Sequence, residues 1–514
     1  MKLIEKTIVA GSMIAVLGNS VSAADRPNVL LIYGDDVGYG DVGAYGAKLI
    51  PTPNIDKLAK QGLMFTDAHC SSATCTPSRF SLLTGLSAFR SRVHILRGDA
   101  KLSIPTNKLT LPKLFKKAGY QTAAIGKWHL GLGAGRTPTD WNKDVKPGPL
   151  EIGFDYSFLM PATTDRVPCV YLENHNVVNL DPNDPITVSY GKALPVSDSV
   201  TNYPDGKKDR SAMTFYKSTQ GHNNSIINGI GRIGYMTGGK SALWKDEKIS
   251  KDMLAKTKEF ISKTQSEKKP FFVYFASQCI HVPRVPSPEF VGKTKLGYRG
   301  DSMVEFDWVT GQLMKFLKDK GLDQNTIVIF SSDNGPVYDD GYDDGSKVRT
   351  STKESDNGHD GSGPYRGGKY QIYEGGTRVP LIVRWPGHIT PGEVSSALIS
   401  QTDFLASFAD LLGVKIREKD SVDSRNYLQT LLGKDKVGAK YIIEDGQRTL
   451  ALRMGDWKYI APTHSKKKKA KKDRLYNLKK DVGEQHNVID ANPEIAKDMK
   501  KTLNQYISNG RMRK

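Results

Sequence analysis

Two pairs of polar residues stand where apolar runs typical of buried strands come to an end. Asp35 and Asp36 follow the first run of this kind, and Asp333 and Asn334 follow a later one. In open α/β sheets, ligands gather at the carboxyl ends of the strands. Three carboxylates and an amide oxygen suit a hard divalent cation such as Ca²⁺, and without a cation the three carboxylates would repel one another. The alternative is that both pairs are turn residues after strands.

A cysteine stands at the start of a predicted helix. Its segment is Cys75-Thr76-Pro77-Ser78-Arg79. Pro77 suits the first helical residue, and Gly85 suits the helix end. Cys75 would then lie just before the helix N-terminus, an environment that favours anions and lowers the pKa of a thiol. The alternative is a structural thiol beside a helix start.

Alternating strands and helices must hold these groups in place. Short apolar runs indicate buried strands at 28–33, 270–276, 326–331 and 380–383. Stretches with helical patterning lie between them, at 54–61, 111–118, 251–263 and 302–318. This alternation predicts an α/β fold, in which βαβ units build a parallel sheet that helices cover on both faces.

The rest of the chain is less regular. Residues 131–250 and 336–368 are rich in Gly, Asp, Asn, Ser or Pro, and irregular segments of such length inside a compact domain are usually functional. Beyond about residue 413 the pattern predicts a hairpin around Gly455-Asp456, a further strand and a terminal helix, at 449–454, 457–461, 474–477 and 493–506. We expect three parts: a signal segment 1–23, a catalytic domain 24–415 and a smaller C-terminal subdomain 416–514 with antiparallel strands.

The first residues indicate export. Lys2 and Lys6 precede an apolar stretch that closes with small residues near Ala23, which is the three-part pattern of a secretory signal. The alternative is a short anchor that stays attached. We expect an exported protein, periplasmic or extracellular. Because no later run of ~20 apolar residues follows, we do not expect an integral membrane protein.

The composition limits the partners. The chain has 514 residues, of which 38% are hydrophobic and 25% charged, as in a globular protein with a large core. Its formal charge of +19 favours polyanions, and for an exported protein we expect anionic glycans and no nucleic acid. The lysine cluster at 466–472 is alternatively a solvated loop tip. The chain has four cysteines, Cys70, Cys75, Cys169 and Cys279, which are too few for a disulfide framework. Cys169 and Cys279 are either buried thiols or a pair.

The cysteine segment resembles a known signature. C-T-P-S-R at 75–79, followed by T-G at 84–85, resembles the signature of type I sulfatases, whose cysteine is oxidised to formylglycine. The two acidic pairs resemble the calcium motifs of this family. Further matching segments follow in the family's order: G-K-W-H-L-G at 126–131, H-V-P at 281–283, G-K at 368–369, Y-E-G-G-T-R-V-P at 373–380 and L-Y-N-L at 475–478, with Asp481 and Glu484. The resemblance covers essentially the whole chain after residue 23.

This resemblance implies a fold and a mechanism. The implied fold is an alkaline-phosphatase-like α/β/α sandwich with a large mixed, mostly parallel sheet, plus a smaller C-terminal α+β subdomain with an antiparallel sheet. Cys75 becomes formylglycine (3-oxoalanine), and its hydrate supplies a nucleophilic oxygen that later expels the sulfate by reforming the carbonyl. A maturation partner is implied too, either a formylglycine-generating enzyme or an anaerobic sulfatase-maturating enzyme.

The remaining roles are also carried over by position. Cations must offset the repulsion between an anionic substrate and an electron-rich nucleophile, and a general acid helps a poor alkoxide to leave. The resemblance implies that Ca²⁺ is bound by Asp35, Asp36, Asp333 and Asn334 together with the converted Cys75. It also implies that Arg79 stabilises the hydrate and that His129 orients or deprotonates it. By the same resemblance, Lys127 and Lys369 hold the sulfate oxygens and His281 protonates the leaving oxygen.

Two segments bear on the substrate. Residues 164–174 and 222–235 resemble a bacterial branch that acts on 6-O-sulfated galactose or N-acetylgalactosamine in sulfated oligo- or polysaccharides. Asp165, Arg166 and His222 are the candidates for binding sugar hydroxyls, because charged groups in a pocket discriminate by hydrogen-bond geometry. The alternative is that they only brace a long loop.

Two other functions are compatible with the sequence. Related folds cleave phosphate esters, so a phosphatase or phosphonate monoester hydrolase of the alkaline phosphatase superfamily is one alternative. The charge and the lysine cluster favour the other, a non-catalytic binder of anionic glycans, which would retain glycans after Cys75→Ala and release no sulfate. We expect a sulfatase, because a binder needs no complete catalytic set.

Overall fold

The structure is a computed structural model of the chain. It describes residues 26–135, 138–346, 357–417, 419–446, 449–462 and 472–509. The predicted signal segment and most of the predicted lysine cluster lie outside these residues. Among the helices of the described ranges, none is both long and apolar enough to cross a membrane.

A sheet of ten strands forms the centre of the molecule. Its order is β15-β2-β14-β13-β1-β12-β4-β5-β6-β7. Every residue of β1, β12 and β13 is buried, as expected for a sheet covered on both faces. The strands are β1 Asn28–Gly34, β2 Leu63–Phe65, β4 Gln121–Lys127, β5 Tyr156–Met160, β6 Leu172–Glu173, β7 Asn176–Val177, β12 Phe271–Ala276, β13 Thr326–Ser332, β14 Leu381–Arg384 and β15 Glu393–Ser395.

The middle of this sheet is parallel and its margins are mixed. β13, β1, β12, β4 and β5 run in one direction, whereas β14 pairs antiparallel with β13. The prediction of a parallel strand at 380–383 is therefore wrong in direction. A parallel strand needs a crossover back to the other end of the sheet, and the chain between β13 and β14 makes no such crossover, since Lys369 still lies beside Asp36 at the carboxyl end of β1.

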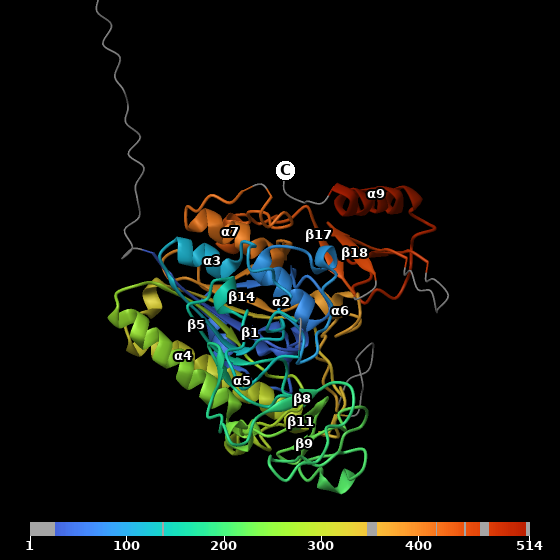
Figure 1. Cartoon of the computed structure of the whole chain (residues 1–514). Helices are drawn as coiled ribbons and strands as arrows, with labels where there is room; N and C mark the ends of the chain where they lie inside the picture. The colour runs from blue at the N-terminus through green and yellow to red at the C-terminus, as the bar shows by residue number, and fades with distance from the viewer. Residues whose placement is uncertain are drawn as a thin grey trace, which may run out of the picture.

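Helices cover both faces of the sheet, which confirms the α/β/α prediction. Figure 1 shows α4 and α5 on one side and α3 and α7 on the other, and α1 packs with α5 while α2 packs with α3 and α7. The predicted helices at 54–61, 111–118, 251–263 and 302–318 correspond to α1, α3, α4 and α5. The helices are α1 Pro53–Lys60, α2 Cys75–Thr84, α3 Leu111–Lys117, α4 Ile249–Ser266, α5 Gly297–Asp319, α6 Glu374–Thr377, α7 Phe404–Leu411, α8 Leu428–Leu431 and α9 Pro493–Asn509.

Short strands tie the irregular segments together. Three two-stranded pairs occur among the described residues, β3 with β16, β8 with β11 and β9 with β10. The last two pairs organise the segment 131–250, for which the sequence predicted little regular structure. Their bounds are β3 Ala68–His69, β8 Thr187–Ser189, β9 Ile226–Ile227, β10 Ile230–Gly231, β11 Tyr235–Thr237 and β16 Ile399–Ser400.

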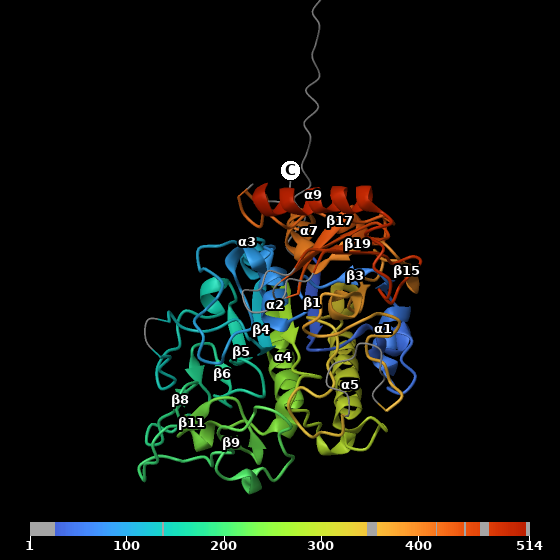
Figure 2. The same ribbon diagram turned by 90° about the vertical axis from the view of Figure 1, so that its right-hand side faces the viewer.

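A second, antiparallel sheet forms the C-terminal part. Its order is β17-β18-β19-β20, and the predicted turn at Gly455-Asp456 joins β18 to β19. One face of α9 covers it, because the buried residues Ala496, Met499, Leu503 and Tyr506 recur at helical spacing. Figure 2 shows α9 lying across this sheet. The predicted domain boundary near residue 415 stays a prediction. The strands are β17 Tyr441–Asp445, β18 Leu450–Met454, β19 Trp457–Ile460 and β20 Arg474–Asn477.

Buried charges join the two parts. Nζ of Lys458 on β19 lies 2.9 Å from a carboxylate oxygen of Glu374 and 2.9 Å from one of Glu444. The ring nitrogens of the fully buried His69 contact Asp67 at 2.8 Å and Glu444 at 2.9 Å. Such buried pairs are costly to break, because removing one partner leaves an uncompensated charge.

Candidate active site

Cys75 and His129 face each other at the start of α2. Cys75 Sγ lies 3.2 Å from Nδ1 of His129, and both residues are 1% exposed. Nε2 of His129 lies 2.8 Å from the carbonyl oxygen of Leu96. A carbonyl only accepts, so Nε2 carries the proton and Nδ1 is free to accept one. Burial, reinforced by Lys127 and Arg166, lowers the pKa of His129 well below its ordinary value and keeps the ring neutral.

Two details of the cysteine prediction are wrong. Helix α2 begins at Cys75 itself, so Pro77 is the third helical residue and not the first, whereas Gly85 ends the helix with a φ of 63° as predicted. The pKa of the Cys75 thiol is raised by burial, although Lys127 and Lys369 oppose the shift. Desolvation outweighs the helix end here, and the unmodified thiol is therefore a poor nucleophile.

The two acidic pairs meet at the carboxyl end of the parallel strands. Gly34 of β1 lies in register with Ser332 of β13, so the residues that follow converge. Oxygen atoms of Asp35, Asp36 and Asp333 all lie within 4.8 Å of one another, and all three residues are fully buried. The convergence expected from the sequence is therefore present.

The donor set fits a hard cation. Asn334 donates from Nδ2 to Asp36 at 2.8 Å, which leaves its Oδ1 buried without a hydrogen-bond donor, as is Oδ1 of Asp35. A buried acceptor without a partner is costly unless a cation or another donor fills the gap. Oxygen-only ligands are those that Ca²⁺ prefers, so these residues could hold it.

Three cations surround the acidic residues, one for each carboxylate. Arg79 Nη2 lies 2.7 Å from Asp333, Lys127 Nζ 2.5 Å from Asp35, and Lys369 Nζ 2.8 Å from Asp36. Burial alone would raise the pKa of Asp333, but Arg79 and Lys127 outweigh it and lower that pKa. Burial likewise opposes the charge of Lys369, but Asp340 and Asp36 hold its pKa well above its ordinary value.

Strand β4 brings Lys127 to the site. Lys127 is the last residue of β4, a strand that was not predicted from the sequence because its Ala and Gly residues form no β-branched run. Gly126 has a φ of 109°, and a Cβ atom there would clash with the carbonyl oxygen of Ala276 on β12. Glycine at this position therefore lets the two strands approach closely beside the site.

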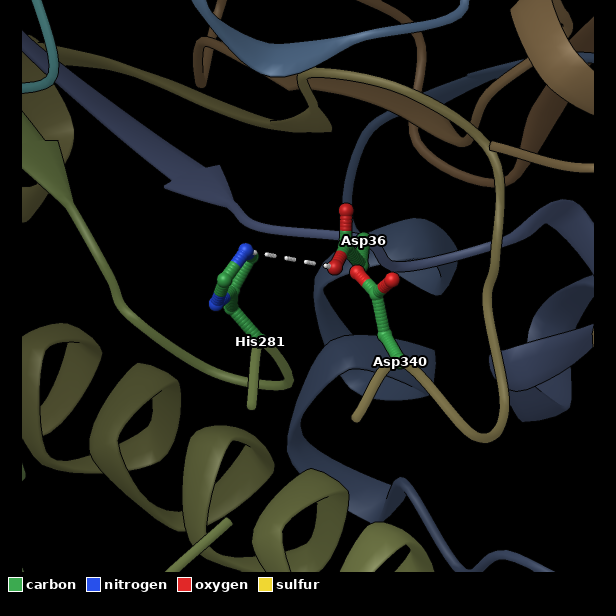
Figure 3. Close-up of side chains that lie close together, drawn as sticks. All are labelled: Asp36, His281 and Asp340. Atoms are coloured by element: carbon green, nitrogen blue, oxygen red, sulfur yellow. Dashed lines mark ion pairs between the residues drawn. The ribbon is translucent and has the colours of Figure 1, made fainter. Parts of the chain in front are cut away.

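His281 lies on the segment after β12, opposite Asp36. Its Nε2 is 4.0 Å from an oxygen of Asp36, and its Nδ1 donates to the carbonyl of Val282 at 2.6 Å. Figure 3 shows Asp36, His281 and Asp340 pointing toward one space. Burial, with Lys369 and Lys127, lowers the pKa of His281 well below its ordinary value. The ring must therefore gain a proton before it can act as an acid.

The three predicted sugar-binding residues lie together beside Cys75. Asp165 accepts from Nε2 of His222 at 3.0 Å and pairs with Arg166 at 3.0 Å. Burial alone would raise the pKa of Asp165, but Arg166 and His222 hold it well below its ordinary value. His222 is brought in by a loop that bonds to another loop, through Thr219 N–H to the carbonyl of Gly341 at 3.0 Å.

A small cavity opens onto Cys75, His129, His281, Lys369 and the three predicted sugar-binding residues. Its volume of about 140 Å³ is below the usual 300–1,000 Å³ of sites for drug-sized ligands, which suits one compact group. Asp35, Asp36, Asp333, Asn334, Arg79 and Lys127 are not among its lining residues. The lining residues are Cys75, Ile95, His129, Asp165, Arg166, His222, Ile233, His281, Asp340, Lys369 and Tyr370.

Two polar residues of this cavity were not predicted from the sequence. Asp340 lies 3.0 Å from Nζ of Lys369 and its side chain is 18% exposed. The hydroxyl of Tyr370 donates to the same carboxylate at 3.0 Å. The Asp- and Gly-rich segment 336–368 was a signal for Asp340, and Tyr370 stands next to Lys369, but neither position had a pattern of its own.

The four cysteines are all free thiols and buried. Cys169 and Cys279 are therefore not a pair, which settles the alternative left open by the sequence. The pKa values of Cys169 and Cys279 are raised to about 12 by burial. Thiols in such apolar surroundings are inert.

Comparison with known proteins agrees with this site. Residues 27–414 match the sulfatase family, and residues 368–509 match the family described as N-sulphoglucosamine sulphohydrolase, C-terminal. The chain is 47% identical over 491 residues to an N-acetylgalactosamine-6-O-sulfatase of Bacteroides thetaiotaomicron, covering 93% of each. It is 29% identical over 517 residues to arylsulfatase A of Homo sapiens, covering 95% of this chain and 89% of the relative.

A solved structure shares the fold over nearly the full length. It comes from work on the metabolism of multiple glycosaminoglycans by Bacteroides thetaiotaomicron, and it matches with a TM-score of 0.86 at 45% identity, covering 94% of this chain and 99% of that chain. This confirms the predicted alkaline-phosphatase-like fold class. The chain belongs to the sulfatase family and is a sulfuric ester hydrolase.

Proposed function

We propose that this enzyme removes the 6-O-sulfate of N-acetylgalactosamine or galactose in a sulfated oligo- or polysaccharide. The observation that carries the proposal is the 3.2 Å contact between Cys75 Sγ and His129 Nδ1, in a cavity that Lys369 also lines. The substrate class is supported by the relative at 47% identity, which is named an N-acetylgalactosamine-6-O-sulfatase.

The proposal includes two groups. Cys75 is oxidised to formylglycine, which as its hydrate supplies the nucleophilic oxygen that the buried thiol cannot. Asp35, Asp36, Asp333 and Asn334 would hold Ca²⁺, which would neutralise negative charge on the sulfate group. The oxidation requires a maturation partner, a formylglycine-generating or anaerobic sulfatase-maturating enzyme.

The side chains around position 75 each have a separate role in the reaction. His129 accepts a proton at Nδ1, because Nε2 is already engaged with Leu96. Lys127 and Lys369 hold sulfate oxygens, since each ammonium has three donors. Lys127 contacts one carboxylate, Asp35, and Lys369 contacts two, Asp36 and Asp340, which leaves each a donor for the sulfate. Arg79 stabilises the hydrate from its place beside Asp333. These fixed donors are buried and act on developing charge in a small site.

His281 protonates the departing alcohol oxygen. Its pKa is lowered by burial and by Lys369 and Lys127, so a bound anionic sulfate offsets those cations and favours the protonated ring. Asp165, Arg166 and His222 hydrogen-bond to the sugar hydroxyls on the open side of the cavity. Residues 1–23 act as an export signal, so the enzyme works in the periplasm or outside the cell.

Two measurements test this function. Mass spectrometry of the Cys75 peptide, after production with a maturation enzyme, should show the mass of formylglycine. Sulfate release should be faster from 6-O-sulfated galactose and N-acetylgalactosamine than from their 3-O- and 4-O-sulfated forms. Active preparations in which every Cys75 remains a thiol would contradict the nucleophile, and faster cleavage of a matched phosphate ester would contradict the substrate class.

A further inference from the structure

The described part of the chain contains a second, larger cavity that the catalytic groups do not touch. Its volume is about 770 Å³, within the usual range of ligand sites. It is a groove between α1 and α5, closed by the turn before β13 and by the end of β14. Figure 2 shows α1 beside α5, and the two helices pack together.

The groove lies at the opposite end of the sheet from Cys75. Asp323 and Gln324 line it just before β13 begins, whereas Asp333 and Asn334 follow the end of the same strand. The strand of seven residues separates the two ends by roughly 20 Å, at ~3.3 Å per residue. A ligand in the groove therefore leaves the reacting groups free.

Charge in the groove favours an anion. Two of its carboxylates are neutralised, because Asp319 pairs with Lys315 at 2.5 Å and Asp323 with Arg384 at 3.6 Å. Two further cations, Lys57 and Lys318, also line it, and both are exposed. Within the described ranges neither has an ion-pair partner. An anionic ligand would give these ammonium groups the partners they lack.

The guanidinium of Arg384 fixes the end of the groove. Arg384 is 7% exposed and lines the groove. Its Nη1 donates to the carbonyl of Asp323 at 3.1 Å, but its Nε is buried without a hydrogen-bond partner. That Nε is closed to solvent, so Arg384 acts on the groove through its charge and through its contacts with Asp323.

The lining also suits a sugar. The half-buried Trp308 packs on Phe290 with ring centroids 5.5 Å apart, which fixes the indole. Gln61 and Gln312 add side-chain amides to the walls. An indole face packs against the apolar face of a sugar ring, and amides both donate to and accept from hydroxyl groups. A bare inorganic anion would use neither feature.

The walls of the groove are held in place before any ligand binds. Asp307 of α5 accepts from the backbone N–H of Asn54 at 3.0 Å and of Ile55 at 2.8 Å, at the start of α1. A Cβ atom at Gly311 would clash with the Asn54 side chain, so glycine allows the close contact of the helices. A preformed site loses less entropy on binding.

We propose that this groove is a second binding site for a strand of sulfated polysaccharide. It holds the polymer at a distance from Cys75 and so raises the local concentration of sulfate esters at the catalytic cavity. The proposal rests on the proposed function, because it takes the enzyme's own class of substrate as the ligand. An acidic protein is the competing ligand, and the test separates the two.

The test measures polymer binding apart from hydrolysis. In a Cys75→Ala background, binding of chondroitin 6-sulfate should weaken about tenfold in Lys57→Gln/Lys318→Gln, since two ion pairs are lost. Trp308→Ala should weaken it too. The matched control is Lys479→Gln/Lys480→Gln, which removes the same charge from the exposed turn after β20 and should bind as before. With an active Cys75, the groove variants should raise the KM for the polymer and leave hydrolysis of N-acetylgalactosamine 6-sulfate unchanged.

Three outcomes would overturn the groove proposal. They are unchanged polymer binding in the groove variants, an equal loss in the control variant, and groove-dependent binding of polyglutamate that matches that of chondroitin 6-sulfate. The last result would assign the groove to an acidic protein. Failure of the proposed function is seen separately, as absence of sulfate release from N-acetylgalactosamine 6-sulfate, which the binding measurement does not involve.

Discussion

Cys75 Sγ lies 3.2 Å from Nδ1 of His129, the ring nitrogen that is free to accept a proton. The other ring nitrogen is engaged by the carbonyl of Leu96, at 2.8 Å. Burial raises the pKa of the thiol and lowers that of the imidazole, so the pair is neutral and the thiol is not activated. The geometry is that of a nucleophile and its base, but an unmodified cysteine at this position is not ionised and so is not an effective nucleophile.

Replacing His129 by Gln should lower kcat and leave KM for sulfate esters nearly unchanged. Glutamine keeps an oxygen that accepts hydrogen bonds but is not basic, so the variant removes the general base that faces position 75, and this loss typically costs about 10²–10⁴-fold in rate. Steady-state kinetics on N-acetylgalactosamine 6-sulfate measure this. Because His129 touches Cys75, the mass of the Cys75 peptide must be checked in the same preparation. A fully converted variant with the kcat of the wild type would refute the role.

Adding Ca²⁺ should raise the melting temperature of the enzyme, and a chelator should lower it. An ion at 100 times its Kd stabilises the folded state by about 2.7 kcal/mol. Asp35→Asn should shrink this shift, because the side chain loses its charge and Oδ1 has no other hydrogen-bond partner. Asp343→Asn, which makes the same change at an exposed position, serves as the control. Equal Ca²⁺-dependent shifts in melting temperature in both variants would show that Asp35 does not bind the ion.

Asp340→Asn should weaken binding of the sugar more than binding of the sulfate. Its carboxylate is partly exposed to the cavity, and a hydrogen bond to a charged group is worth about 1.5–3 kcal/mol. We expect kcat/KM to fall at least tenfold for N-acetylgalactosamine 6-sulfate and much less for an aryl sulfate without hydroxyls. An equal loss for both would show instead that Asp340 acts through Lys369, which it contacts at 3.0 Å.

Part of the site could be predicted because local sequence patterns determine where its strands end and where its helix begins. Buried parallel neighbours in register bring their carboxyl ends together, so the residues after β1 and β13 had to converge. Proline and glycine near Cys75 gave the helix that presents it, with an error of two residues at its start. Helical patterning gave α4 and α5 on one face and the shorter α3 on the other, and the turn at Gly455 gave the hairpin of the C-terminal sheet.

The rest of the site depends on pairings between distant segments. His222 and Asp340 meet only because the loop near Thr219 bonds to the loop near Gly341, and neither loop has a periodic pattern. At Gly341, φ is 117° and a Cβ atom would clash with the His222 ring. A requirement of this kind depends on a residue more than a hundred positions away, so no local rule could show it. β4 was missed for a related reason, since its burial and not its composition makes it a strand.

The buried His69 should make stability depend on pH. Burial alone would lower its pKa, but Glu374, Asp67 and Glu444 outweigh burial and raise it above its ordinary value. The folded protein then binds this proton more tightly than the unfolded chain does. The stabilisation is complete below the unfolded pKa of about 6.5 and is lost as the pH rises through the folded value. The free energy of unfolding, measured by denaturant titration, should therefore fall above about pH 6.5.

His69→Gln should flatten that fall, because its neutral amide can donate to one of the two carboxylates but has no proton to lose. The buried Glu484, whose pKa is raised to about 8 by burial, also favours the protonated folded state and leaves a smaller slope in the variant. The difference between the slopes of wild type and variant thus isolates His69. His94→Gln, at an exposed position, should keep the full slope of the wild type. Identical slopes in His69→Gln and His94→Gln would mean that His69 does not carry the extra proton, and that the charges around it are balanced by Lys458 and the arginines alone.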